Sequence, residues 1–134
     1  MDQDFETLYK KASELTGVKE LNKSVSYAHV GCALMTDQGN IYTGICIDAP
    51  CGIGFCAEHA AIAEMLKHNE SRIVKIVATG KMGILPPCGR CRELIKLVNS
   101  DNMKTQVMIA KDTIVTLEEL LPNAWIAWYK TRIE

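Results

Sequence analysis

Two short cysteine motifs constrain this chain more than any other feature of its sequence. They are Cys56-Ala57-Glu58 and Pro87-Cys88-Gly89-Arg90-Cys91. Their three cysteines can offer three thiolates to one zinc ion, which leaves the fourth tetrahedral position open to water, as in a catalytic rather than a structural site. Glu58 lies two residues after the first ligand, where its carboxylate is placed to move protons to and from that water. The motifs therefore predict one zinc ion per chain, bound by these three cysteines, with Glu58 as the catalytic residue.

A further cysteine leaves a second interpretation of the zinc site open. Cys51 lies five residues before Cys56, so that Cys51, Cys56, Cys88 and Cys91 form a C-x4-C…C-x2-C set. Four cysteines could close completely around a structural zinc ion. Folds built on such closed sites are usually small, whereas 134 residues with 48% hydrophobic side chains are enough for a proper core. We therefore favour the open site, with Cys51 outside it.

The overall composition predicts one domain, residues 1–134, that acts on a small molecule. A net charge of −1 gives no basic surface for nucleic acid, and no apolar run reaches the ~20 residues of a membrane helix. The N-terminus is acidic and lacks the features of a signal peptide, so we expect a cytoplasmic protein without a membrane partner. In that compartment cysteines are thiols or metal ligands. Cys32 and Cys46 are accordingly expected to be small core residues.

Hydrophobic periodicity and turn residues predict eight elements in the order α-β-β-α-β-α-β-α. The predicted helices span residues 3–16, 57–68, 88–98 and 116–122, and the predicted strands span 30–35, 41–47, 73–79 and 106–110. Asp37-Gln38-Gly39-Asn40 supplies turn chemistry between the first two strands, and residues 18–27, 48–55 and 80–87 are expected to be loops. This order predicts a mixed sheet with helices on both faces and parallel crossovers through the two cysteine-bearing helices.

The electrostatics of the predicted site explain why both motifs should begin helices. Three thiolates around Zn²⁺ leave one excess negative charge, which weakens the metal as a Lewis acid. Helix N-termini beginning at Cys56 and Cys88 would offset this charge and lower the thiol pKa values. His59, Arg90 and Arg92 could add hydrogen-bond donors around the sulfur atoms.

With these motifs in view, the chain resembles the cytidine deaminase family of small, tetrameric, zinc-dependent enzymes. The C-x-E…P-C-x-x-C pattern matches the zinc deaminase signature in its three-cysteine form. The resemblance runs from about Tyr27 to Pro122. Besides the two cysteine motifs, it includes the strand segments Val30-Gly31-Cys32-Ala33-Leu34 and Gly39-Asn40-Ile41-Tyr42-Thr43-Gly44.

The resemblance implies a fold, a reaction and an assembly. The fold would be a three-layer α/β/α sandwich, for which we expect a mixed, mostly parallel sheet. The reaction would be hydrolytic deamination of a nucleoside, with Glu58 transferring protons between water, a ring nitrogen and the departing ammonia. The assembly would be a homotetramer with active sites completed by neighbouring subunits. The aromatic tail, Trp125-Ile126-Ala127-Trp128-Tyr129, would then anchor an interface.

The departures from the family pattern concern the sugar of the substrate. The family's aromatic residue before the first strand, and its Asn-x-Glu pair after the second, are replaced here by Ala28, Cys46 and Asp48. We expect these three residues, with Ala57 and Pro87, to lie at the bound substrate. The family's arginine after C-A-E is His59, and the form P-C-G-R-C-R is similar to the blasticidin S deaminase branch.

These departures leave more than one function open. The favoured function is deamination of cytidine, deoxycytidine or a sugar-modified analogue. The alternatives are deamination of blasticidin S or another aminated heterocycle, a non-catalytic module with structural zinc, and a nucleic-acid editing deaminase, which the charge disfavours.

Overall fold

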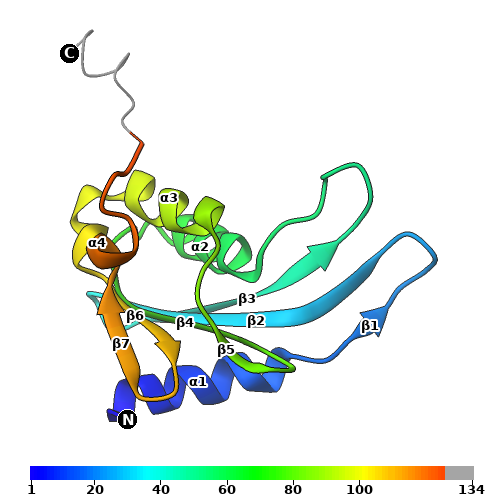
Figure 1. Ribbon diagram of the computed structural model, residues 1–134, viewed down its shortest axis with the longest axis horizontal. Helices are drawn as coiled ribbons and strands as arrows, with labels where there is room; N and C mark the ends of the chain where they lie inside the picture. The colour runs from blue at the N-terminus through cyan, green and yellow to red at the C-terminus, as the bar shows by residue number, and fades with distance from the viewer. Residues whose placement is uncertain (126–134) are drawn as a thin grey trace, which may run out of the picture.

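A seven-stranded sheet separates one long helix from the other three in this computed structural model (Figure 1). The structure describes residues 1–125. The helices are α1 (Gln3–Leu15), α2 (Ala57–Lys67), α3 (Gly89–Val98) and α4 (Leu117–Leu120), with a short 3₁₀ helix, η1 (Ser100–Lys104). The strands are β1 (Lys19–Glu20), β2 (Ser26–Thr36), β3 (Ile41–Asp48), β4 (Ile73–Gly80), β5 (Gly83–Leu85), β6 (Gln106–Ala110) and β7 (Thr113–Thr116).

The three-layer α/β/α architecture and the mixed sheet are confirmed, but the expectation of a mostly parallel sheet is wrong. Among the strands described, only β4 and β6 pair in parallel, and the other neighbours are antiparallel. β3 and β4 do run in the same direction, yet β2 lies between them and pairs antiparallel with both. The remaining antiparallel pairs each join a short strand to its neighbour in the sequence: β1 pairs with β2, β5 with β4 and β7 with β6.

The predicted helices and strands all appear, with ends that differ by a few residues. β6 has the predicted bounds, and α4 begins after Thr116, whose hydroxyl accepts a hydrogen bond from the Glu119 N–H at 3.3 Å. The sequence did not indicate β1, β5, β7 or η1. Strands of two to four residues are too short to show an alternating hydrophobic pattern. For this reason the segments that contain β1 and β5 were expected to be loops.

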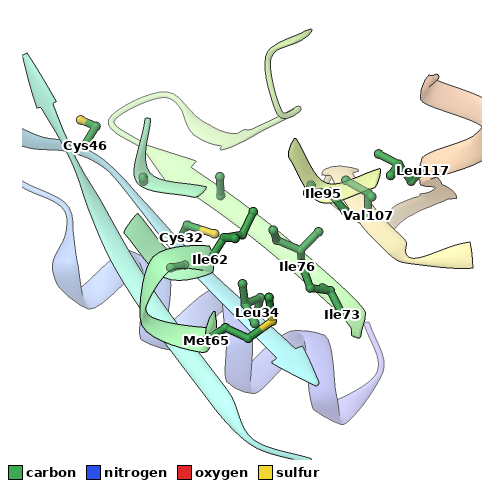
Figure 2. Close-up of a cluster of buried hydrophobic side chains, with 13 residues drawn as sticks. Cys32, Leu34, Cys46, Ile62, Met65, Ile73, Ile76, Ile95, Val107 and Leu117 are labelled. Atoms are coloured by element: carbon green, nitrogen blue, oxygen red, sulfur yellow. The ribbon is translucent and has the colours of Figure 1, made fainter. Parts of the chain in front are cut away.

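Two hydrophobic clusters fill the spaces on either side of the sheet. In the larger cluster, Ile62 and Met65 of α2 pack against Leu34 of β2 and Ile76 of β4 (Figure 2). The smaller cluster holds α1 to the opposite face through side chains that include Phe5. Cys32 and Cys46 are both buried in the larger cluster, which confirms their prediction as core residues.

A close contact fixes the position of α2, which carries Glu58, on the sheet. A Cβ atom added to Gly44 of β3 would lie 2.4 Å from the backbone nitrogen of Ala61 and 2.6 Å from the carbonyl oxygen of Ala57. Only glycine permits this approach of strand and helix backbones. The first turn of α2 is therefore held directly against β3. No helix within residues 1–125 is long and apolar enough to cross a membrane.

Candidate metal centre and substrate cavity

The three predicted zinc ligands meet at the N-termini of two neighbouring helices. Cys56 is the N-cap of α2 and Cys88 is the N-cap of α3, and neither side chain makes a capping hydrogen bond. Cys91 lies in the first turn of α3. Its sulfur atom is 3.5 Å from that of Cys88, which in turn is 3.5 Å from that of Cys56. The two crossovers thus bring together cysteines that are far apart in the sequence.

This cluster has the composition and spacing of a three-cysteine metal site. The three sulfur atoms all lie within 4.8 Å of one another, so one ion can contact all of them. Within residues 1–125, no other group of cysteine, histidine and acidic side chains meets this criterion. Cys51 is not part of the cluster, and it lies exposed in the loop before α2 with a φ of 63°. The geometry therefore fits the open three-cysteine site rather than the closed four-cysteine one.

The environment of the sulfur atoms determines how readily they lose their protons, which metal binding requires. Burial, followed by the negative charge of Glu58, raises the pKa of Cys91 well above its ordinary value. Burial likewise raises the pKa of Cys56, with a further contribution from Cys88. Burial also opposes ionisation of Cys88, but hydrogen bonds from the N–H and thiol groups around it outweigh burial and lower its pKa. Three such thiols lose their protons together only when a cation compensates their charge.

The three residues that were expected to donate hydrogen bonds to the sulfur atoms have different positions. His59 Nδ1 lies 3.4 Å from the sulfur of Cys91, where a ring N–H can donate to it. Burial and the nearby charge of Arg90 lower the pKa of His59. Arg90 lines the cavity in front of the metal centre. Arg92 instead donates to two backbone carbonyl oxygens, those of Pro87 and Leu120.

Glu58 has the surroundings of a carboxyl group that exchanges protons. It lies in the first turn of α2, two residues after Cys56, and its side chain is only 5% exposed. Burial raises its pKa, although its own backbone N–H and Cys91 partly oppose the shift. A carboxyl group with a raised pKa can be both a proton acceptor and a proton donor near neutral pH.

A cavity of about 800 Å³ opens in front of Cys56, Cys88 and Glu58. This volume is suited to a small organic molecule. Of the five predicted substrate contacts, three line the cavity: Cys46, Asp48 and Ala57. The other two do not. Ala28 is 1% exposed, and Pro87 is buried beside a separate small void that Glu58 also lines.

Among the cavity residues that the sequence analysis did not identify, two have polar side chains, Ser26 and His29. Ala28 has a φ of 65°, and the pairing of β2 with β3 shifts between Tyr27 and Gly31. This irregularity breaks the alternation of side chains along β2, so Ser26 and His29 face the same cavity. A left-handed alanine leaves no pattern in the sequence, and a strict two-residue period would have placed Ser26 and Ala28 on the same face.

These two residues belong to a polar group with Asp48. His29 Nε2 lies 3.2 Å from the hydroxyl oxygen of Ser26 and 3.5 Å from a carboxylate oxygen of Asp48. The Cys46 sulfur accepts the Val30 N–H at 3.3 Å and lies 3.9 Å from Asp48 Oδ2. The group combines hydrogen-bond donors and acceptors, which suits the recognition of hydroxyl or amino substituents.

Comparisons with known proteins agree with this site. The family model described as "Cytidine and deoxycytidylate deaminase zinc-binding region" matches residues 3–108. A blasticidin-S deaminase from Bacillus cereus is 32% identical over 130 residues, which cover 90% of this chain and 90% of the relative. A cytidine deaminase from Halalkalibacterium halodurans is 32% identical over 103 residues, covering 73% of this chain and 77% of the relative.

Solved structures share the fold. The cytidine deaminase from Mycobacterium leprae superimposes with a TM-score of 0.76 at 26% identity, covering 91% of this chain and 100% of the other. The enzyme from Mycobacterium tuberculosis gives a TM-score of 0.77 at 23% identity, covering 93% and 99%. The three-cysteine cluster fits one zinc ion per chain. This chain belongs to the family of cytidine and deoxycytidylate deaminases, which are zinc-dependent hydrolytic deaminases.

Proposed function

We propose that residues 1–134 form a single domain that hydrolyses the exocyclic amine of a cytosine nucleoside. Water replaces the amino group on the ring carbon, which yields the uracil form and ammonia. The observation that carries the proposal is the placement of Glu58 in the same cavity as Cys56, Cys88 and the polar group of Ser26, His29 and Asp48. One part of the cavity can perform the hydrolysis while another holds the sugar.

Glu58 has a separate task at each stage of this reaction. Cys56, Cys88 and Cys91 would hold the zinc ion, which when bound lowers the pKa of a water molecule. The ionised Glu58 carboxylate can accept a proton from the attacking water molecule as the water oxygen bonds to the ring carbon. The protonated carboxyl group then donates that proton to the ring nitrogen beside the reacting carbon. Glu58 next takes the second proton of the added water and passes it to the amino group, so that the C–N bond breaks and ammonia leaves. The buried position of Glu58 suits this cycle, since its raised pKa makes the carboxyl group a better proton acceptor.

The polar group supports a nucleoside whose sugar differs from ribose. The sulfur of Cys46 already accepts the Val30 N–H, and a thiol is a weak hydrogen-bond partner for a substrate hydroxyl. Ala28 is buried and offers no wall to the sugar. The available groups are the imidazole of His29 and the carboxylate of Asp48, whose side chains are 40% and 58% exposed. These groups suit an altered or amino-bearing sugar better than an unmodified ribose.

Blasticidin S is the second candidate substrate, and one specific observation favours it. The relative whose alignment covers 90% of both chains is a blasticidin-S deaminase. Cytidine and deoxycytidine remain candidates because the second relative is a cytidine deaminase. The choice among these substrates depends on the residues around the sugar, since the metal centre is common to all of them.

We also propose that the protein is a cytoplasmic homotetramer whose subunits share active sites. Phe55 lines the cavity and is 37% exposed, and Ile53 in the same loop is 72% exposed. Apolar side chains at the rim of a cavity are suited to coverage by another subunit. The predicted interface anchors after Trp125 lie outside the described residues. Light scattering at micromolar concentration should give a tetramer mass, and a monomer mass would contradict this assembly.

A deamination screen tests the proposed function. The zinc-loaded protein is incubated separately with cytosine, cytidine, deoxycytidine, blasticidin S and adenosine, and released ammonia is measured together with the change in ultraviolet absorbance. We expect turnover of cytosine nucleosides, with a sugar-altered member preferred. Turnover of adenosine alone, or of free cytosine alone, would contradict the proposal, as would the absence of activity on every compound.

A further inference from the structure

Arg92 links the loop that carries a metal ligand to the end of a distant helix. Its Nε donates to the carbonyl oxygen of Pro87 at 2.8 Å, and its Nη1 donates to the carbonyl oxygen of Leu120 at 3.0 Å. Its backbone N–H donates to the carbonyl oxygen of Cys88 at 3.0 Å. Arg92 therefore contacts both residues of the Pro87–Cys88 dipeptide and the last residue of α4.

The contact with Pro87 bears directly on Cys88. A peptide unit is planar, so the carbonyl oxygen of Pro87 and the backbone nitrogen of Cys88 lie in one plane. A hydrogen bond to this oxygen therefore also fixes the orientation of the peptide plane that contains the backbone nitrogen of Cys88. Pro87 is buried whereas Cys88 is exposed, so the plane is anchored on the buried side of the ligand. A buried carbonyl oxygen also requires a partner, which Arg92 provides.

The contact with Leu120 connects this plane to the C-terminal part of the chain. Leu120 ends α4, where carbonyl oxygens have no partner within the helix and bind cationic side chains well. The start of α4 is fixed by Leu117, which is fully buried and whose N–H donates to the Thr105 carbonyl oxygen at 2.9 Å. Leu120 is therefore a fixed point against which Arg92 can hold the Pro87 peptide.

Two neighbours of Arg92 on α3 hold the chain beyond α4 in a similar way. Glu93 accepts the Trp125 N–H at 3.1 Å, and Lys96 Nζ lies 3.4 Å from the Trp125 carbonyl oxygen. Arg92, Glu93 and Lys96 thus bind backbone groups of residues 120–125 along α3. Of these three side chains, Arg92 is the one that also donates to the loop before Cys88.

We propose that Arg92 is a positioning residue that sets the orientation of Cys88 for metal binding by fixing the Pro87 peptide against the end of α4. A guanidinium suits this task because its nitrogen atoms diverge in a rigid plane, so that Nε and Nη1 reach two different carbonyl oxygens. A lysine has one nitrogen on a flexible chain and can hold only one of them well. The inference rests on the zinc site of the proposed function and is independent of its substrate.

The test compares Arg92→Gln and Arg92→Lys with Lys96→Gln, a control on the same helix that loses a contact with Trp125 only. Zinc affinity is measured by competition with a chelator. The absorption spectrum of the Co²⁺-substituted protein reports the ligand geometry. We expect Arg92→Gln to weaken zinc binding about 10- to 100-fold, as is typical for groups that orient metal ligands, and to alter the Co²⁺ bands. Arg92→Lys should lose part of that affinity, and Lys96→Gln should match the unaltered protein.

Two outcomes would overturn the inference. One is an Arg92→Gln protein with unchanged zinc affinity and an unchanged Co²⁺ spectrum. The other is a Lys96→Gln protein that loses as much affinity as Arg92→Gln, which would assign the effect to general docking of the C-terminal segment. If Arg92→Gln does not fold, Arg92→Lys decides by the same two measurements. Neither measurement uses a nucleoside, so an error in the proposed substrate leaves this test intact.

Discussion

The sulfur atoms of Cys56 and Cys88 lie 3.5 Å apart although 32 residues separate them in the chain. Each cysteine occupies the N-cap position of a helix that packs over the same face of the sheet, so the fold brings two helix N-termini to one point. The partial positive charge of both N-termini is directed at the sulfur atoms. The fold thereby compensates part of the negative charge that three thiolates bring to one metal ion.

This arrangement predicts different effects for two cysteine substitutions. Cys91→Ser should reduce zinc content well below one ion per chain, because it removes one of three clustered sulfur atoms. Cys51→Ser should leave zinc content unchanged, because Cys51 lies exposed outside the cluster. Atomic absorption on the purified proteins measures both. Loss of zinc from Cys51→Ser would support the closed four-cysteine site instead.

Much of this metal centre could be predicted from the sequence because local rules determine it. The motifs at residues 56–58 and 87–91 identify the candidate ligands by residue type and spacing. Helix-forming residues after each motif place these ligands at the starts of helices. The direction of the strands was predicted less well. β3 and β4 run in the same direction, but the sequence does not reveal that β2 inserts between them and makes both pairings antiparallel.

The sugar side of the cavity could not be predicted, for a physical reason of another kind. His29 lines the cavity because Ala28 adopts a left-handed conformation that costs about 1 kcal/mol or more for a non-glycine residue. The surrounding sheet imposes that conformation, since a long strand pairs on both sides of the irregularity. Such a conformation depends on tertiary structure, so the resemblance to the family pattern predicts a substrate role for Ala28 and none for His29.

The polar group around Asp48 predicts how substrates are discriminated. Asp48→Asn should lower kcat/KM on the preferred nucleoside about 10-fold or more, if one hydrogen bond worth ~1.4 kcal/mol is lost. His29→Ala should act in the same direction, because His29 and Asp48 lie 3.5 Å apart in the cavity. Side-by-side kinetics on cytidine and sugar-modified cytosine nucleosides measure these effects.

A matched control separates this role from a general effect of charge. Asp37→Asn makes the same chemical change in the exposed turn between β2 and β3 and should leave kcat/KM unchanged. The unaltered protein should favour sugar-modified nucleosides over cytidine. Efficient turnover of cytidine with rejection of modified sugars would contradict the proposed role of this group and make the chain an ordinary cytidine deaminase.

The buried carboxylate of Glu70 should make the stability of the fold depend on pH. Hydrogen bonds from Thr36, Tyr42 and Asn40 lower the pKa of Glu70, although burial opposes them. The hydrogen bond between Tyr42 and Glu70 also raises the pKa of Tyr42 to about 12. Since the folded-state pKa of Glu70 lies below the unfolded value of about 4.3, its stabilising effect is complete above that value and is lost as pH falls through the folded pKa.

Comparison of two variants isolates this effect. Glu70→Gln should be less stable than the unaltered protein at neutral pH, and the difference in free energy of unfolding should shrink as pH falls from about 5 to 3. Glu64→Gln serves as the control, because Glu64 pairs with Lys67 and His68 at the surface. Denaturant unfolding at each pH provides the values. A difference for Glu70→Gln that stays constant across this range would show that ionisation of Glu70 does not stabilise the fold.

Turnover by Glu58→Gln at matched zinc content tests the central claim most directly. Glu58 is 5% exposed beside the three clustered cysteines, and its proposed role is to transfer protons without binding the metal. The variant should keep the fold and one zinc ion per chain, while turnover of the preferred nucleoside falls about 10²-fold or more. Near-normal turnover by a fully zinc-loaded Glu58→Gln protein would contradict the account.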